Sequence, residues 1–360
     1  MAIAEYDNFN NVVSCNALYK AAKLSRKSIR WKASVQRYFM SFLRNIIQLR
    51  KMLLAGEDVT LGFIVFYVCD RGKTRRIRAV HFKERVPQRS LCDNALIPVL
   101  SRSLIYDNGA SLKGKGITFA LHRLKRHLHE YYRRHGTNEG YILLIDFSGY
   151  FDNILHEPIY EMLDKAFSDK RIVNLARQFV EPFGEKSVGI GSQVSQILAV
   201  AYRSPIDHFI KEVLRAEFAA CYMDDTYIIS ESKEFLWYCL DEVEKKCSRI
   251  GIIINRKKTQ VVKLSHGFPF MKGVYYLTDT GKVIARPCRK NTAKHRRKLK
   301  KLKALMNKGV LSLQQISCSH NSYRGYIVNE YNCHRTVRNM DKLFHELYGY
   351  DVQINRKEKF

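Results

Sequence analysis

An aspartate closes the apolar run Ile142-Leu143-Leu144-Ile145-Asp146-Phe147, and two more stand in the middle of Cys221-Tyr222-Met223-Asp224-Asp225-Thr226-Tyr227-Ile228-Ile229. The first run predicts a strand that ends at its acid, and the second predicts a hairpin with both acids at its tip. Adjacent carboxylates repel one another, so we expect a divalent cation to neutralise the three acids. Their oxygens are hard ligands that suit Mg²⁺, which completes its octahedron with phosphate oxygens and water. In the alternative interpretation the paired acids form only a turn, and Asp146 only caps a helix.

The chain as a whole is strongly basic. Its 360 residues include 62 Lys and Arg against 34 Asp and Glu, which gives a formal net charge of +28. With 46% hydrophobic residues, 12% aromatic residues and 7 prolines, the composition excludes a disordered basic tail and a collagen-like chain. The long-range field attracts nucleic acid or an anionic membrane surface. Three acids, two Mg²⁺ ions and a phosphate-attracting surface predict phosphoryl transfer, in which one ion activates a hydroxyl and the other stabilises the leaving pyrophosphate.

The expected location and redox state follow from what the sequence lacks. It shows no secretory signal and no run of about 18 apolar residues, so we expect a cytoplasmic protein that does not span a membrane. Nine cysteines at scattered spacings, without a CxxC pair, predict reduced and mostly buried thiols. Cys318, His320, Cys333 and His334 are residue types that bind zinc, but their spacing fits no zinc-finger pattern, and we expect no zinc there.

Three further segments stand out by charge and periodicity. Residues 16–54 predict two helices with a basic amphipathic face, and residues 61–82 predict a hairpin that turns at Asp70-Arg71-Gly72. Residues 286–310 carry 11 Lys or Arg and no acid, with apolar residues at helical spacing. We expect a helix that packs on one face and meets phosphate on the other, or else a solvated cationic helix.

Both acidic stretches resemble motifs of a known enzyme family, the reverse transcriptases, and specifically of its bacterial group II intron-like branch. Tyr222-Met223-Asp224-Asp225 is similar to the family's YxDD box, and Asp146 to Asp152 is similar to its first palm motif. Other matches follow the family's order along the chain: Lys73-Thr74-Arg75-Arg76-Ile77 with Phe82 and Arg85, Ala110 to Gly116, Gly189 to Gln196, then Gly251, Asn255, Lys258 and Thr259, and last Gly267, Phe268 and Phe270. The resemblance implies an α+β right-hand polymerase with fingers, a ferredoxin-like palm built on an antiparallel sheet, and a helical thumb.

The resemblance also implies a division of the chain and a reaction. It places a basic helical N-terminal extension at residues 1–60, fingers at 61–135, a palm at 136–280 and a helical thumb at 281–360. The implied activity is that of an RNA-directed DNA polymerase, which extends a primer with dNTPs on an RNA template by two-metal catalysis. Its partners would be the RNA template, a DNA or RNA primer and dNTPs, without a membrane.

Metal ligands are carried over from the family to matching positions only. The resemblance implies that Asp146 and Asp224 bridge two Mg²⁺ ions, for which Mn²⁺ would substitute. Asp225 would complete the site, and the carbonyl of Phe147 would be a further ligand.

Nucleotide-binding residues are carried over in the same way. Lys73 and Arg75 would hold the β- and γ-phosphates, although several other cations of that basic hairpin could do so. Phe151, five residues after Asp146, would be an aromatic steric gate that excludes a 2′-hydroxyl, or else a core residue. Lys258 would donate a proton to pyrophosphate or clamp a phosphate, or else be a surface lysine.

Template and primer contacts are expected along the palm and the thumb. Arginine and tyrosine interleaved around residues 322–326 suit base stacking and phosphate tracking along a duplex. The residues assigned to these contacts are Gln196, Tyr222, Gly267, Phe268, Arg296, Arg297 and Arg324.

Ile190 departs from the family pattern, because most members have Gln at this place in the nucleotide site. An apolar residue offers no amide donor or acceptor, so base discrimination that uses this contact should weaken, unless the change is neutral drift. The motif is similar to that of reverse transcriptases from diversity-generating retroelements, which copy a template RNA with errors at adenines. We therefore expect a bacterial or phage-encoded retroelement enzyme with a cognate structured non-coding RNA and an accessory protein. The alternatives are an antiviral-defence or retron-like reverse transcriptase and, from another class, a non-catalytic RNA-binding maturase or scaffold.

Overall fold

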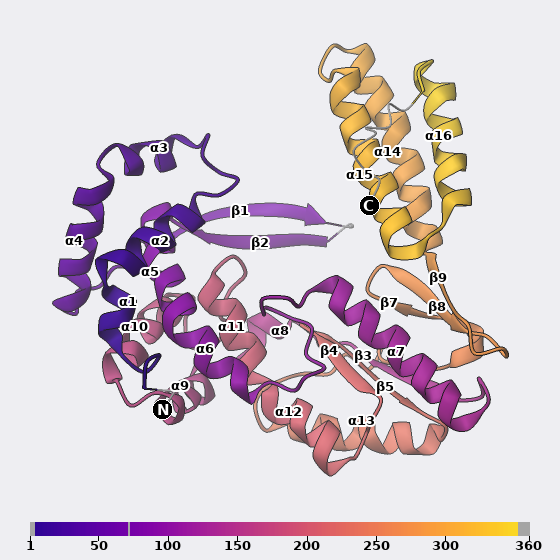
Figure 1. The fold of residues 1–360 in the computed structure, drawn as a ribbon, viewed down its shortest axis with the longest axis horizontal. Coiled ribbons are helices and arrows are strands. Elements are labelled where there is room, and N and C mark those ends of the chain that lie inside the picture. The colour runs from indigo at the N-terminus through magenta and orange to yellow at the C-terminus, as the bar shows by residue number, and fades with distance from the viewer. Residues whose placement is uncertain (1–3, 71–72, 352–360) are drawn as a thin grey trace. The chain divides into compact units, whose positions relative to one another are not determined.

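The computed structural model describes residues 4–70 and 73–351, with the backbone alone for Asp70, Lys73 and Arg75. The chain forms two compact units, each assembled from segments that are far apart in the sequence (Figure 1). The first unit consists of Met1–Arg123, Ile145–Ile228 and Trp237–Gln260, and the second of Leu124–Leu144, Ile229–Leu236 and Val261–Phe360.

Helices dominate both units. The α-helices are α1 (Phe9–Val13), α2 (Cys15–Ser25), α3 (Ala33–Met40), α4 (Phe42–Leu54), α5 (Phe82–Leu91), α6 (Ile97–Leu100), α7 (Ile117–His135), α8 (Tyr150–Asn153), α9 (His156–Ala166), α10 (Lys170–Val180), α11 (Gln193–Tyr202), α12 (Ser204–His208), α13 (Lys233–Ser248), α14 (Arg289–Asn307), α15 (Leu313–Tyr331) and α16 (His334–Tyr348). Short 3₁₀ or π-helical turns cover Cys92–Leu96, Ser101–Ser103, Glu181–Phe183, Phe209–Val213 and Leu264–His266. The strands are β1 (Phe63–Asp70), β2 (Lys73–Val80), β3 (Tyr141–Ile145), β4 (Ala219–Tyr222), β5 (Asp225–Ser230), β6 (Gln260–Lys263), β7 (Phe268–Phe270), β8 (Gly273–Leu277) and β9 (Val283–Pro287).

Strand pairing gives three sheets within the described residues. β1 and β2 form an antiparallel hairpin that starts with Phe63 opposite Val80, so the hairpin predicted at residues 61–82 is confirmed. Its expected turn includes residues 71–72, which lie outside the described residues. The other sheets have the strand orders β4-β5-β3-β6 and β7-β8-β9. The strand that leads into Asp146 is therefore the sheet neighbour of the strand that begins at Asp225.

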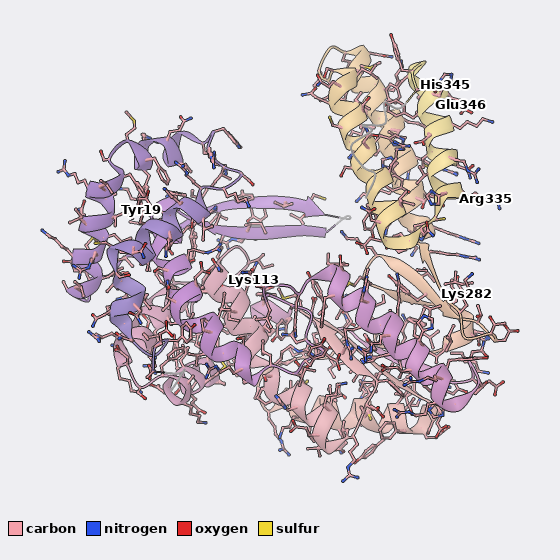
Figure 2. All side chains as sticks on the ribbon, in the orientation of Figure 1. Tyr19, Lys113, Lys282, Arg335, His345 and Glu346 are labelled. Carbon is pink, nitrogen blue, oxygen red and sulfur yellow. The ribbon has the colours of Figure 1, made fainter. Side chains whose placement is uncertain are left out.

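Three helices, not the predicted two, cover residues 16–54. Ser41 separates α3 from α4, because its φ of −116° and ψ of 40° interrupt the helix. The prediction is wrong because the apolar spacing continues across this break, where the rings of Phe39 and Phe42 stack with centroids 4.5 Å apart. The ring of Tyr19 of α2, a residue labelled in Figure 2, also packs on Phe42, with ring centroids 5.0 Å apart, and these aromatic contacts hold the three helices together.

α11 is the buried helix of the first unit on which the candidate site rests. The hydroxyl of Ser192 caps its first turn by accepting a hydrogen bond from the Ser195 amide at 3.4 Å. All side chains from Ile197 to Tyr202 are buried. A helix that is apolar over most of its circumference needs cover on every side, so elements from several parts of the chain pack around it.

The cysteines are free but not mostly buried. All nine are unpaired, as predicted. Four are buried, two are partly buried, and Cys15, Cys69 and Cys318 are exposed. The expectation of mostly buried thiols is thus wrong, because it rested on composition and spacing, which say nothing of where a single side chain points.

The second unit ends in a three-helix bundle of α14, α15 and α16. The basic helix predicted at residues 286–310 is confirmed over Arg289–Asn307, while its first residues belong to β9. The bundle core contains Leu299 of α14, Ile316 of α15, and Phe344 and Tyr348 of α16. Among the described residues, no helix is both long and apolar enough to cross a bilayer.

A buried chain of polar groups crosses this bundle. Nε2 of His295 on α14 lies 3.0 Å from Nδ1 of His320 on α15, and Nε2 of His320 lies 2.9 Å from Oδ1 of Asp341 on α16. Arg324 also pairs with Asp341, at 2.9 Å. Burial, together with the neighbouring His320 and Lys298, lowers the pKa of His295 to about 4. Burial also lowers the pKa of His320, against the opposing effect of Asp341.

We predict that bundle stability falls as the pH drops from about 6.5 toward about 4. The pKa of His295 is lower in the folded than in the unfolded chain, so the unfolded chain takes up its proton first. Each such histidine contributes a slope of at most about 1.4 kcal/mol per pH unit in this window. Denaturant unfolding of the wild type and of His295→Gln, measured over this pH range, should show a shallower decline for the variant. The exposed His122 provides a matched control in His122→Gln, and equal slopes for all three proteins would contradict the prediction.

Candidate active site

Asp146 follows β3 directly and is held by a turn from another part of the chain. Its carbonyl accepts a hydrogen bond from the Asn255 amide at 2.8 Å, and its own amide donates to Oγ1 of Thr259 at 3.3 Å. The half-buried carboxylate places Oδ2 2.9 Å from Nζ of Lys258. Residues 255–259 therefore fix both the backbone and the carboxylate of Asp146.

The chain bends sharply after Asp146. Phe147 is buried and forms a β-bridge with Ile254, while the Ser148 amide donates to the Ile253 carbonyl at 2.8 Å. Gly149 then adopts φ 54° and ψ 42°, a left-handed conformation that is open to glycine without steric cost. The bend starts α8, which carries Phe151.

Tyr150 anchors α8 on α11. Its buried hydroxyl donates to the carbonyl of Ala199 at 2.5 Å, and burial raises its pKa far above the ordinary value, so it stays a neutral donor. The half-buried Phe151 ring meets the Tyr150 ring edge-on, with centroids 5.7 Å apart. The first acidic motif is therefore tied to the core of the first unit through one buried tyrosine.

The paired acids lie at a two-residue hairpin turn, as predicted. Tyr222 of β4 stands opposite Asp225 of β5, so only Met223 and Asp224 form the turn. Met223 has a φ of 53°, a left-handed value that costs a residue with a side chain about 1 kcal/mol. Asp224 is exposed at the tip, and Asp225 is half-buried at the start of β5.

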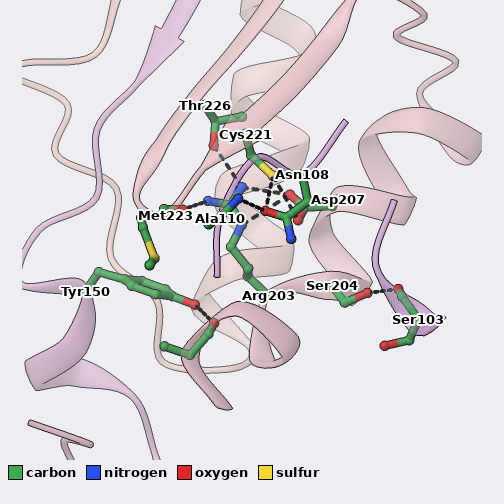
Figure 3. A network of polar contacts seen from close by, with 11 residues as sticks. Ser103, Asn108, Ala110, Tyr150, Arg203, Ser204, Asp207, Cys221, Met223 and Thr226 are labelled. Carbon is green, nitrogen blue, oxygen red and sulfur yellow. Dashed lines mark hydrogen bonds and ion pairs between the residues drawn. The ribbon is translucent and has the colours of Figure 1, made fainter. Parts of the chain in front are cut away.

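One buried arginine contacts both acid-bearing segments, and Figure 3 shows its hydrogen bonds to the second of them. Nη1 of Arg203, between α11 and α12, donates to the carbonyl of Met223, and Nη2 donates to Oγ1 of Thr226 at 2.8 Å. Its guanidinium carbon also lies 5.3 Å from the centroid of the Phe147 ring. Since Phe147 follows Asp146 and Met223 precedes Asp224, the end of β3 and the acidic turn meet at this arginine.

The loop before α11 adjoins the same place. The Val188 amide donates to the Phe151 carbonyl at 3.1 Å, and the hydroxyl of Ser195 donates to the Val188 carbonyl. Gly189 has a φ of 65°, and a Cβ there would lie 1.9 Å from the ring of Phe183, so glycine is required. The loop therefore packs tightly on the first acidic motif.

A family model described as reverse transcriptase (RNA-dependent DNA polymerase) matches residues 84–314. The chain belongs to the reverse transcriptase family. With the sheets and helices described above, this confirms the α+β right-hand polymerase class, and the family is one of RNA-directed DNA polymerases. The matched residues of this reverse transcriptase include all three acids, Phe151, Ile190 and Lys258.

Comparison with solved structures finds fungal telomerases. Telomerase from Candida albicans, in complex with a TWJ fragment of telomeric RNA, is 12% identical with a TM-score of 0.49, covering 83% of this chain and 57% of that one. Apo telomerase from Candida tropicalis is 12% identical with a TM-score of 0.47, covering 62% and 47%. A form truncated from its C-terminal domain is 13% identical with a TM-score of 0.48, covering 61% and 54%. This chain thus spans about half the length of these telomerases, and the likeness assigns neither substrate nor partner. No curated protein matches the sequence.

The donor chemistry of the site fits a divalent cation, which polymerases of this family generally use. Asp146, Asp224, Asp225 and the Phe147 carbonyl offer only oxygen, the ligand that Mg²⁺ prefers. The cation that Asp146 meets here is Lys258. Within residues 4–70 and 73–351, no three His, Cys, Asp or Glu side chains are gathered closely enough to hold a metal. The ligand types are therefore present, but the three carboxylates do not form a closed cluster.

The expected nucleotide-binding residues divide into two groups. Phe151 and Ile190 belong to segments that are in contact, because the Phe151 carbonyl accepts a hydrogen bond from the amide of Val188, two residues before Ile190. Lys73 and Arg75 belong to β2, opposite Asp70 and Val68, and their side chains lie outside the described residues.

The expected template and primer residues are not equally accessible. Gln196 is exposed on α11, and Tyr222 is half-buried, which raises the pKa of its hydroxyl. Gly267 precedes β7, but the ring of Phe268 is fully buried and lies 6.2 Å from the ring of Tyr275. The Phe268 ring is therefore not accessible to a primer.

The arginines of the three-helix bundle also differ in accessibility. Arg324 is half-buried and paired with Asp341, so it stabilises the bundle. Arg296 and Arg297 are exposed and line a surface pocket of ≈ 430 Å³ between α14 and α16, together with Lys300, Asn339, Lys342, Leu343 and Glu346, the last of which is labelled in Figure 2. This basic pocket is the part of the bundle best suited to phosphate.

Among the residues whose types could bind zinc, His320 and Cys333 have other polar partners. His320 belongs to the buried chain with His295 and Asp341, and Cys318 is exposed. Sγ of Cys333 lies 3.0 Å from Oγ1 of Thr336.

Sequence reasoning missed the residues that join the two acidic motifs, Arg203 and Asp207. A signal was present, because Arg203 interrupts the apolar run of α11 and Asp207 follows four residues later, at the spacing of a helical ion pair. A charged pair predicted among buried apolar residues indicates that its side chains form hydrogen bonds with other segments of the chain.

Proposed function

We propose that this chain extends the 3′-hydroxyl of a DNA or RNA primer with dNTPs on an RNA template, with two Mg²⁺ ions. The observation that carries the proposal is the contact of Arg203 with both the Phe147 ring and the Met223 carbonyl, inside the span that matches the family. This contact brings the end of β3 and the acidic turn to the same arginine, which supports a common site for their carboxylates.

The three acids would hold the ions. Asp146 and Asp224 would bridge them, Asp225 would complete the site, and the Phe147 carbonyl would be a further ligand. Bound Mg²⁺, or Mn²⁺ in its place, activates the attacking hydroxyl and stabilises the departing pyrophosphate. Lys258, at 2.9 Å from Asp146, would meet the same phosphates, as a proton donor or as a clamp.

The incoming dNTP would lie between α8 and the loop before α11. The Phe151 ring would exclude a 2′-hydroxyl by contact with the sugar, and Ile190 would face the base pair. Lys73 and Arg75 would hold the β- and γ-phosphates, Arg75 through a bidentate fork and Lys73 as a point charge.

The chain would divide as right-hand polymerases do. We assign residues 1–60 to a basic N-terminal extension, 61–135 to fingers, 136–280 to the palm and 281–360 to the thumb. Gln196, Tyr222 and the backbone at Gly267 would contact template or primer near the site. On the thumb, the exposed Arg296 and Arg297 would bind duplex phosphates, and Arg324 would act through the bundle that it stabilises.

For the biological role we propose error-prone cDNA synthesis in a bacterial or phage diversity-generating retroelement of the group II intron-like branch. The support is Ile190, which cannot form the hydrogen bonds of the amide that most of the family carries there. A cognate structured non-coding RNA and an accessory protein would be its partners. An antiviral-defence or retron-like role, and a non-catalytic RNA-binding maturase or scaffold, are the competing assignments.

Asp224→Asn combined with Asp225→Asn should abolish primer extension. Removing metal ligands removes several kcal/mol of transition-state stabilisation, so incorporation should fall by at least about 10³-fold. The assay is extension of a labelled primer on a defined RNA template. Glu57→Gln with Asp58→Asn, two adjacent exposed acids that follow α4, is the matched control and should extend normally. Undiminished incorporation by the Asp224 and Asp225 variant would favour the scaffold assignment.

Phe151→Ala, in the same assay, should admit ribonucleotides. Removing the ring opens the space that a 2′-hydroxyl needs, so the preference for dNTPs over rNTPs should fall by about 100-fold, on the order of 3 kcal/mol of discrimination. Phe151→Tyr keeps the ring and should keep the preference. An unchanged preference in Phe151→Ala would identify Phe151 as a core residue only.

Ile190→Gln should make synthesis more accurate at template adenines. One restored hydrogen bond is worth about 1 kcal/mol, so misincorporation there should fall about 5-fold. Sequencing of cDNA copied from a defined RNA measures the rate at each template base. Ile190→Leu keeps an apolar side chain of equal size and should keep the error spectrum. A low and even spectrum in the wild type would contradict the retroelement role.

A further inference from the structure

Arg203 and Asp207 form a buried ion pair at the junction of α11 and α12. Their side chains are 3% and 4% exposed, and Nη2 of Arg203 lies 2.7 Å from Oδ1 of Asp207, with Nε at 3.2 Å from the same oxygen. A buried ion pair adds little stability over a well-packed apolar pair of similar volume. The reason for this pair is therefore to be sought in what else the two side chains hold.

The ion pair forms hydrogen bonds with three residues of the acidic hairpin (Figure 3). Arg203 donates to the carbonyl of Met223 in the turn and to Oγ1 of Thr226 on β5. Oδ2 of Asp207 accepts from Sγ of Cys221 on β4 at 3.3 Å, and burial raises the pKa of that thiol, so it remains a donor. Both strands and the turn between them are thus hydrogen-bonded to one ion pair.

These hydrogen bonds matter because the backbone conformation of the turn is unfavourable in free energy. A two-residue turn tolerates a left-handed residue, but glycine or asparagine is the usual choice, and here it is Met223 with a φ of 53°. Rotating the Met223–Asp224 peptide would relieve the strain and swing the Asp224 carboxylate. The bond from Arg203 to the Met223 carbonyl opposes this rotation.

The same guanidinium also contacts the first acidic motif, and it thereby links the turn to that motif. It lies over the ring of Phe147, 5.3 Å from the centroid, and Phe147 is fixed by its bridge to Ile254. An apolar pair would fill this space equally well, but it would hold neither the carbonyl nor the hydroxyl.

We propose that Arg203 and Asp207 are positioning residues that fix the direction in which Asp224 and Asp225 project relative to Asp146, and thereby set the affinity of the site for divalent cations. The part concerning cation affinity rests on the proposed function, whereas the part concerning the turn does not.

The test replaces the pair by apolar residues, in Arg203→Met combined with Asp207→Leu. Because the volumes are similar, loss of the ion pair itself should change the melting temperature little, and the remaining decrease should come from the lost hydrogen bonds to the hairpin. Amide hydrogen exchange of residues 222–226, measured in metal-free full-length protein, should be about 10-fold faster, and Mn²⁺ should bind about 10-fold more weakly by equilibrium titration. At saturating Mg²⁺ the KM for dNTP should be unchanged while kcat falls.

Two further variants keep the test decisive. Leu163→Ala removes a fully buried leucine of α9, so it lowers the melting temperature but should leave exchange at the turn and Mn²⁺ affinity unchanged. Thr226→Val removes a single partner of Arg203 at constant volume and should raise exchange at the turn less than the double variant does.

The possible results distinguish a failure of the positioning role from a failure of the proposed polymerase function. Wild-type exchange and Mn²⁺ affinity in the double variant, or in Thr226→Val should the double variant not fold, would overturn the positioning role. Faster exchange with unchanged Mn²⁺ affinity would overturn the link to the cation. Since exchange is measured without metal or substrate, its result stands even if Asp224→Asn with Asp225→Asn were to leave polymerisation intact.

Discussion

The guanidinium of Arg203 contacts both acid-bearing segments, through the Met223 carbonyl of the acidic turn and through the Phe147 ring at the end of β3, and other contacts of the first unit hold each segment in place. The turn at residues 255–259 binds the backbone of Asp146 on both sides and brings Lys258 to its carboxylate. The buried pair of Arg203 and Asp207 holds the acidic hairpin from behind. α11 supports both arrangements, since it receives the hydroxyl of Tyr150 and ends at Arg203. A buried cation, Arg203, thus helps to position the acidic hairpin, whose Asp224 is exposed at the surface.

The distribution of the +28 charge follows the same logic. A few cations are committed to structure, such as Arg203 beside the site and Arg324 within the bundle. Others remain exposed, such as Arg296 and Arg297 on α14, where like charges repel one another. Exposure separates the two classes, whereas the sequence shows all of them simply as basic residues. Counting charges therefore indicates the kind of partner, and burial indicates which residues are available to meet it.

Local patterns in the sequence are sufficient for the strand that ends at Asp146, the acidic hairpin, the basic hairpin and the long basic helix, because each has a periodicity of its own. They failed at Ser41, where the same periodicity runs through a one-residue break. They also failed where one side chain makes a distant contact: nothing near Phe268 in the sequence says that its ring packs on Tyr275, and nothing near Arg203 names Met223 or Phe147. The acids could be found from their neighbours in sequence, but the residues that position them could be found only from their neighbours in space.

The central claim is that Asp146 and Asp224 share divalent cations at the point where β3 ends and the acidic turn begins. Anomalous diffraction from crystals of the protein grown with Mn²⁺, an RNA template, a primer and a dNTP tests it most directly, because the signal locates the ion without reference to activity. The account predicts anomalous peaks between these two carboxylates, with at least one within about 2.3 Å of an oxygen from each. Peaks elsewhere, or none beside Asp146 and Asp224 while the dNTP is bound, would contradict it.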